Sequence, residues 1–212
     1  SEEAAESGLY ILDDNGVTRH YFSAGDVIFN DKDGDHSITT ADREVIGDPN
    51  PDFYGNIFTS LAWKWFKLDI NFNYSVGNDV FNYMRQQLES GSRFMNQTLA
   101  MTQRWQNEGQ VTTVPKATFQ DPMGNSRFSD RWIEDGSYLR LKTVTLSYTL
   151  PVNSSFLQGL QFWIQGNNLL TFSKYLGSDP EFSPTSAVIG QGIDLGQLPQ
   201  SRSIVAGIKI NL

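Results

Sequence analysis

Apolar and hydroxyl side chains alternate strictly between Thr143 and Leu150. The even positions carry Val, Leu, Tyr and Leu, and the odd positions carry Thr, Thr, Ser and Thr. A period of two predicts a β-strand with one apolar face and one polar face. A soluble sandwich would turn the apolar face inward, whereas a transmembrane barrel would turn it outward against lipid.

The same period recurs in four further segments, at residues 57–63, 66–76, 160–170 and 204–212. In the second of these, aromatic and aliphatic side chains alternate with Lys, Asp, Asn and Ser, as a wall between lipid and a watery lumen requires. The last segment stops on the apolar Leu212 in mid-pattern. We expect this from a strand that closes the seam of an outer-membrane barrel, although a plain edge strand gives the same pattern.

Short and long connections alternate along the chain. Brief links at 64–65 and 151–159 separate long intervals at 77–137 and 171–200, and the first interval holds helix-like pieces at 80–88 and 94–105, with Asp79 as the N-cap of the first. Outer-membrane barrels have short periplasmic turns and long external loops. Five strands cannot close a barrel, and open sheet edges are not tolerated in lipid, so the rest of a larger barrel is expected elsewhere.

Composition narrows the function classes. The chain has 212 residues, a formal charge of -8 and no cysteine. The negative charge argues against nucleic acid as a partner, and the missing cysteines remove disulfides and thiolate chemistry. No apolar run reaches 18 residues, which excludes a transmembrane helix but leaves a barrel open. The two histidines, His20 and His36, lie in no triad-like or metal-like context, so we expect no enzymatic activity.

Recognisable site chemistry is confined to residues 31–42, DKDGDHSITTAD. The spacing would wrap oxygen ligands around one hard cation, and it resembles an EF-hand or dockerin-type calcium loop. Position six is His36 rather than Gly, which requires an uncommon positive φ, and position twelve is Asp rather than Glu. A solvated acidic turn is the alternative. The predicted ligands of a structural Ca²⁺ are Asp31, Asp33 and Asp35, the carbonyl of Ser37, the hydroxyl of Thr39, and Asp42.

Four segments in order carry a family resemblance: residues 25–57, 129–151, 165–181 and 198–212. Together they closely resemble the C-terminal region of SusC/RagA-type TonB-dependent transporters of the Bacteroidetes outer membrane. The resemblance implies a barrel of about 22 strands with an N-terminal plug. It also implies energisation through the TonB complex and a SusD-like surface lipoprotein that helps to capture glycans or peptides. Plug, TonB box and most strands lie outside this sequence.

The sequence therefore predicts an all-β fold, the C-terminal strands of a large antiparallel transmembrane β-barrel with long extracellular loops that contain short helices. Residues 1–56 are expected to form an extracellular loop segment with the calcium-type loop, and residues 57–212 the barrel strands. The expected function is part of an outer-membrane nutrient importer that imports oligosaccharide or peptide and is embedded in outer-membrane lipid of a Gram-negative bacterium. The alternative is a soluble, calcium-stabilised β-rich binding or structural module.

Overall fold

The computed structural model describes residues 2–13, 15–152, 159–182 and 190–211. The chain forms two compact units. Unit 1 comprises Ser1–Ile46 and Tyr83–Trp132, and unit 2 comprises Gly47–Asn82 and Ile133–Leu212. None of the helices in the described ranges is long and apolar enough to cross a membrane.

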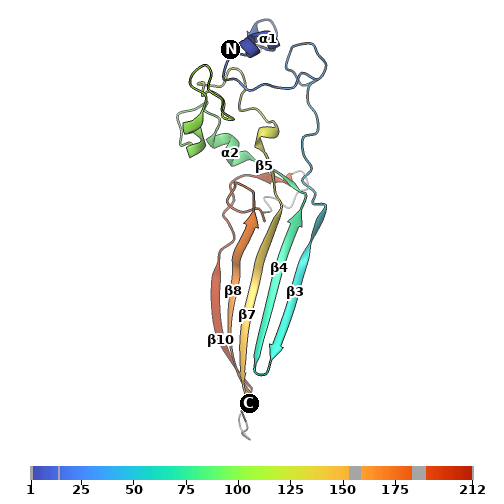
Figure 1. The fold of residues 1–212 in the computed structure, drawn as a ribbon, viewed down its shortest axis with the longest axis vertical. Helices are drawn as coiled ribbons and strands as arrows, with labels where there is room; N and C mark the ends of the chain where they lie inside the picture. The colour runs from blue at the N-terminus through green and yellow to red at the C-terminus, as the bar shows by residue number, and fades with distance from the viewer. Residues whose placement is uncertain (1, 14, 153–158, 183–189, 212) are drawn as a thin grey trace. The chain divides into compact units, whose positions relative to one another are not determined.

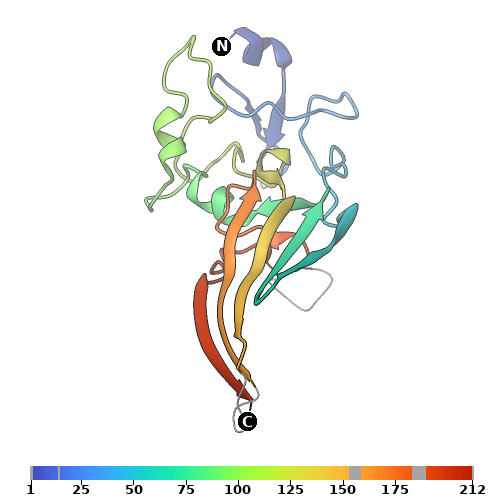
Figure 2. The ribbon, with the colours of Figure 1, turned by 60° about the horizontal axis from the view of Figure 1, so that its bottom comes forward.

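Unit 2 is built on one five-stranded antiparallel sheet (Figures 1 and 2). Its strands lie in the order β10-β8-β7-β4-β3. All five expected strands are confirmed, although β3 begins four residues before the expected start at residue 57. Leu212 and most of the expected turn at 151–159, residues 153–158, lie outside the described residues. The bounds are β3 Phe53–Trp63, β4 Phe66–Val76, β7 Tyr138–Leu150, β8 Gly159–Ser173 and β10 Ser203–Asn211.

The register of the five strands places their alternating apolar side chains on one face of the sheet. Leu68 pairs with Leu61 on one side and with Leu146 on the other, and Leu146 in turn pairs with Ile164. Leu146 and Ile164 are 43% and 49% exposed. We call this surface the apolar face; it carries Phe53, Ile57, Leu61, Trp63, Phe66, Leu68, Ile70, Phe72, Tyr74, Val76, Leu139, Leu141, Val144, Leu146, Phe162, Ile164, Leu170, Phe172, Ile204, Ile208 and Ile210.

No protein layer among the described residues buries the apolar face. The apolar side chains that are buried all lie outside the five long strands, whereas Ile208 and Ile210 are 62% and 59% exposed. A soluble sandwich would bury these side chains against a second sheet. Their exposure fits a surface that is covered by something other than this chain, as the outer wall of a barrel is. The buried apolar residues are Leu9, Phe22, Ile38, Val80, Met101, Val114, Trp132 and Tyr175.

A β-bulge at Lys142 keeps the two faces separate. The register between β4 and β7 shifts there, so that Phe72 pairs with Leu141 and Asn71 with Thr143. One extra residue in a strand reverses the direction of every side chain beyond it. The bulge therefore returns Leu139 and Leu141 to the apolar face, and it directs Arg140 to the opposite, polar face.

A second, small sheet corrects the expected helix at residues 80–88. Asp79–Asn82 forms strand β5, which pairs with β6 (Ile133–Asp135) and β9 (Ile193–Asp194), and only Tyr83–Leu88 is the helix α2. The assignment of Asp79 as N-cap was wrong, since its carboxylate accepts the backbone N–H of Asp48 at 2.9 Å. In the expected helix at 94–105, only Leu99–Gln103 is helical, as a 3₁₀ segment.

Unit 1 is tied together by one buried carboxylate. It contains α1 (Glu2–Ser7), β1 (Tyr10–Leu12), β2 (Arg19–Tyr21), α2 and the 3₁₀ segment Asp130–Trp132. The Asp26 carboxylate, whose side chain is 1% exposed, accepts hydrogen bonds from Lys116 Nζ at 2.9 Å and from Asn125 Nδ2 at 2.7 Å. It also accepts the backbone N–H of Ser23 at 2.8 Å. The Asp26 carboxylate thus connects its own segment to the segments that contain Lys116 and Asn125.

Acidification should loosen unit 1 through Asp26. Burial acts to raise the pKa of Asp26, but the hydrogen bonds from Asn125 and Lys116 outweigh it and hold that pKa below the ordinary value of 3.8. Because the folded pKa is the lower one, the stabilisation is present above pH 3.8 and is lost as the pH falls through the folded value. Asp26→Ala should cost about 3 kcal/mol at neutral pH. Hydrogen exchange of residues 22–27 and 116–126 measures both effects.

The control for this prediction is Glu108→Ala, which removes an exposed carboxylate from the same unit. Asp26→Asn keeps the shape of the side chain without its charge and should abolish the pH dependence. Equal exchange in Asp26→Ala and Glu108→Ala would contradict the assigned role.

Candidate functional site

The acidic loop at residues 31–42 is folded around its own carboxylates. Asp31 Oδ1 and Oδ2 accept the backbone N–H groups of Gly34 and His36 at 2.8 and 2.9 Å. Asp42 closes the loop, since its two oxygens accept the N–H groups of Lys32 at 2.9 Å and Thr39 at 2.7 Å. His36 has the positive φ that its place in the pattern requires, at 65°. The backbone therefore already follows a tight wrap.

Three of the predicted ligands converge. Asp31, Asp33 and Asp35 each offer a carboxylate oxygen, and these atoms lie within 4.8 Å of one another. The hydrogen bond from Asp35 N–H acts to lower the pKa of Asp33, but desolvation and the neighbouring carboxylates leave that pKa raised. Mutual repulsion of this kind is what a divalent cation relieves.

The other three predicted ligands differ in position. Asp42 lies outside the converging group. Its carboxylate oxygens accept hydrogen bonds from backbone N–H groups, and these bonds lower the pKa of Asp42. Thr39 Oγ1 accepts the N–H of Ala41 at 3.1 Å. Ser37 is buried where the loop meets Tyr10, but that bridge uses the carbonyl of His36 and the N–H of Ile38, not the Ser37 carbonyl. Three of the six predicted ligands, all carboxylates, therefore lie together, and the Ser37 carbonyl takes no part in the bridge to Tyr10.

A buried ion cluster on the polar face was not anticipated from the sequence. Arg140 is 3% exposed, forms a hydrogen-bonded ion pair with Asp179, and lies 2.9 Å from Glu181 Oε2. Lys142 Nζ binds the same Glu181 at 3.0 Å and Gln200 Oε1 at 2.7 Å. The cluster attaches the loop that follows β8 to the polar face of β7. The available signal was the run YLRLK, in which two cations interrupt an otherwise neutral strand.

Removal of Arg140 should release that loop. Burial acts to raise the pKa of Asp179, but the hydrogen bond from Arg140 holds that pKa below its ordinary value. Arg140→Met leaves Asp179 buried and unpaired, which should cost about 3–5 kcal/mol. Arg140→Met combined with Asp179→Leu should recover part of the loss, because no uncompensated charge remains, while the N–H groups of Glu181 and Gln200 lose their acceptor. A double-mutant cycle read by thermal unfolding in detergent measures the coupling, and strict additivity would contradict it.

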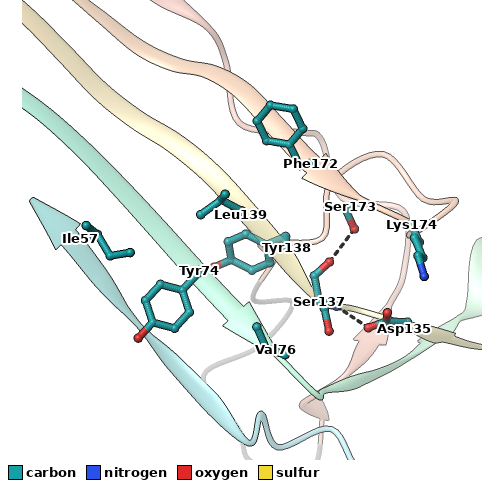
Figure 3. A pocket seen from close by; sticks show the side chains of 10 residues that line it. All are labelled: Ile57, Tyr74, Val76, Asp135, Ser137, Tyr138, Leu139, Phe172, Ser173 and Lys174. Carbon is teal, nitrogen blue, oxygen red and sulfur yellow. Dashed lines mark hydrogen bonds between the residues drawn. The ribbon is translucent and has the colours of Figure 1, made fainter.

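An apolar hollow of about 640 Å³ lies at the loop end of the apolar face, the end opposite the turn at 64–65 (Figure 3). Apolar side chains occupy its strand side, and polar side chains occupy the end where the strands stop. Ser173 Oγ donates to the Ser137 carbonyl at 2.8 Å, and Ser137 N–H donates to Asp135 Oδ1 at 2.9 Å. The lining residues are Ile57, Tyr74, Val76, Asp135, Ser137, Tyr138, Leu139, Phe172, Ser173 and Lys174.

These features define an open antiparallel sheet of transmembrane barrel type, with one apolar and one polar face. No protein-family model matches the chain. Among curated proteins it is 35% identical over 194 residues to TonB-dependent receptor P3 of Formosa agariphila, covering 88% of this chain and 19% of the relative. It is 22% identical over 188 residues to TonB-dependent receptor SusC of Bacteroides thetaiotaomicron, covering 86% and 17%.

Solved structures give the same answer. The RagAB peptide importer in its "open-open" state matches with a TM-score of 0.69 and 26% identity, over 96% of this chain and 20% of that chain. The resemblance read from the sequence is therefore confirmed: the chain has the sequence pattern and the fold of a segment of a SusC/RagA-type TonB-dependent receptor. It spans about one fifth of the length of the relatives that it matches. The alternative of a soluble calcium-stabilised module is not supported.

Proposed function

We propose that the protein to which this chain belongs is a TonB-energised importer of the outer membrane. The five-stranded sheet is a section of its barrel wall and crosses the membrane several times. The apolar face meets lipid and the polar face lines the lumen. The single observation that supports this most is the continuous apolar face, which the described protein leaves uncovered.

The same proposal assigns the partners. The remainder of the barrel supplies strands for the edges of β3 and β10, each of which pairs with only one strand here. A SusD-like surface lipoprotein and the TonB complex act with other parts of the protein. Glycan or peptide is the imported substrate, without an enzymatic step and without nucleic acid. The names of the relatives, a SusC receptor and a peptide importer, support these partners.

Arginine at Leu146 should block assembly of the barrel, whereas arginine at Thr145 should be tolerated. Leu146 lies on the apolar face, where a cation near the bilayer midplane costs about 2–4 kcal/mol. Thr145 pairs with Asp69, whose Oδ1 is buried without a hydrogen-bond partner, so an arginine there gains an opposite charge. The heat-modifiable electrophoretic mobility of the full-length protein reports assembly. Equal loss in both variants would count against the membrane placement.

We further propose that the acidic loop binds one structural Ca²⁺ through Asp31, Asp33 and Asp35, with the Ser37 carbonyl completing the set. Thr39 and Asp42 then act mainly by holding the backbone of the loop. The ion would neutralise part of the carboxylate repulsion, which acts directly beside the buried Ile38. Bound ion would thereby stabilise the packing of Ile38 against Leu9 and Phe22.

Calcium removal should expose the loop to trypsin at Lys32, which lies between Asp31 and Asp33, and at Arg43, which directly follows Asp42. Chelation, or Asp33→Ala with Asp35→Ala, should raise cleavage several-fold in the full-length protein, because no cation then bridges the carboxylates and holds the loop closed. The barrel should remain heat-resistant, since its strands are held by ladder hydrogen bonds. Magnesium should protect less well than calcium, because it demands a stricter octahedral shell.

The matched control is Glu3→Ala with Glu108→Ala, which removes two exposed charges from unit 1 outside the loop. That variant should keep the calcium-dependent protection. Cleavage that is the same with calcium and with chelator in the native protein would exclude the site.

A further inference from the structure

The apolar hollow at the loop end of the sheet is graded in polarity along the strands. Its innermost residue, Ile57, belongs to the row that also contains Phe72. The next row outward holds Tyr74, Leu139 and Phe172. Serine, aspartate and lysine side chains follow beyond the strand ends. An elongated molecule with an apolar tail and a polar head matches this gradient.

The hollow is open because Gly55, which has no side chain, leaves space for the ring of Tyr74. Gly55 pairs with Tyr74, and the phenol of Tyr74 leans over it so closely that a Cβ on Gly55 would lie 2.8 Å from the Tyr74 hydroxyl. The ring therefore lies toward β3, on the side away from Leu139 and Phe172 (Figure 3). The space over Leu139 stays open, and Leu139 and Phe172 remain 38% and 59% exposed.

One cationic side chain, Lys174, lies at the polar end of the hollow. Lys174 directly follows β8 and is exposed, and its ammonium group forms no salt bridge within the described part of the chain. Asp135, the one carboxylate of the lining, accepts the Ser137 N–H at 2.9 Å, and hydrogen bonds from Ser137 together with the nearby charge of Lys174 lower its pKa. Lys174 is thus the group at this end that can donate charge-assisted hydrogen bonds to a phosphate oxygen.

We propose that this hollow binds one phosphorylated lipid of the outer leaflet, with an acyl chain over Leu139 between Tyr74 and Phe172 and its phosphate at Lys174. The inference rests on the proposed membrane placement, in which the loop end of the sheet lies at the outer surface. The volume of about 640 Å³ falls within the roughly 300–1,000 Å³ of small-molecule sites. The hollow is continuous with the apolar face, so a lipid reaches it without leaving the bilayer.

A second barrel is the competing occupant, and the shape of the surface disfavours it. Protein interfaces of standard size bury about 800 Å² per partner and are closely packed at their centre. Here the graded lining comprises ten residues at one end of the strands, and the hollow is shallow and widely open toward the apolar face. A single lipid acyl chain can enter such a hollow, whereas the flat wall of a second barrel would cover it without filling it.

Native mass spectrometry of the delipidated full-length protein tests the proposal, with monophosphorylated lipid A as the probe. The wild type should retain one lipid more tightly than the rest. Lys174→Ala should weaken this binding on the order of tenfold, the loss expected for one charge-assisted contact. Leu139→Trp should abolish it, because the indole fills the hollow without making the surface polar.

Two matched controls accompany these variants. Leu146→Trp makes the same change on the same strand and face outside the hollow, and Lys209→Ala removes an exposed cation on the polar face. Both should bind lipid as the wild type does. Lipid A without its phosphate should bind more weakly than the probe, and inorganic phosphate should not compete.

Equal retention in all four variants would overturn the proposal. Competition by inorganic phosphate would replace it with a simple anion site. A change of oligomeric state in lipid-free Leu139→Trp would show that a second copy occupies the face, and would also overturn it. All four variants keep the apolar face apolar and should assemble normally, so failure here is distinct from failure of the membrane placement, which the Leu146→Arg and Thr145→Arg pair tests.

Discussion

The antiparallel register of the five long strands is the constraint on which the rest of the structure depends. It pairs the backbone groups inside the sheet and brings rows such as Leu61, Leu68, Leu146 and Ile164 to one surface. A slip by one residue would carry each row to the opposite face. Because lipid offers no hydrogen bonds, such a sheet is stable in a membrane only when its two outer strands find further partners. The segment is therefore structurally a part of a larger barrel.

The bulge at Lys142 determines which side chains of β7 lie on each face of the sheet. It preserves the apolar face where the strand continues toward its loop end, and at the same point it brings Arg140 and Lys142 to the polar face. Two cations there attract Asp179 and Glu181 from the loop that follows β8. A buried pair of this kind adds little net stability over an apolar packing, but breaking it is costly. Its effect is to select one position for the loop.

Charge has a different role in unit 1. Asp26 is compensated by Lys116 and Asn125 inside the protein, so it holds segments together without outside help. The carboxylates of Asp31, Asp33 and Asp35 converge without a salt bridge in the described part of the chain, and Lys32 pairs instead with Glu44 at 3.9 Å. The first arrangement is complete within the chain. The second leaves negative charge uncompensated, and the calcium proposal rests on this difference.

The sequence by itself determined the strands, the two faces and the acidic spacing, because a period of two is a local property that any register must respect. It also carried the family resemblance, through four ordered segments. Only the tertiary structure decided that Asp79–Asn82 is a strand, since pairing with β6 and β9 overrides its local helical pattern. The convergence of Asp31, Asp33 and Asp35 apart from Asp42 depends on backbone turns of the loop that the spacing alone does not fix. The burial of Arg140 and the hollow beside Gly55 depend on contacts between residues far apart in the sequence. Such contacts leave no periodic trace along a single chain.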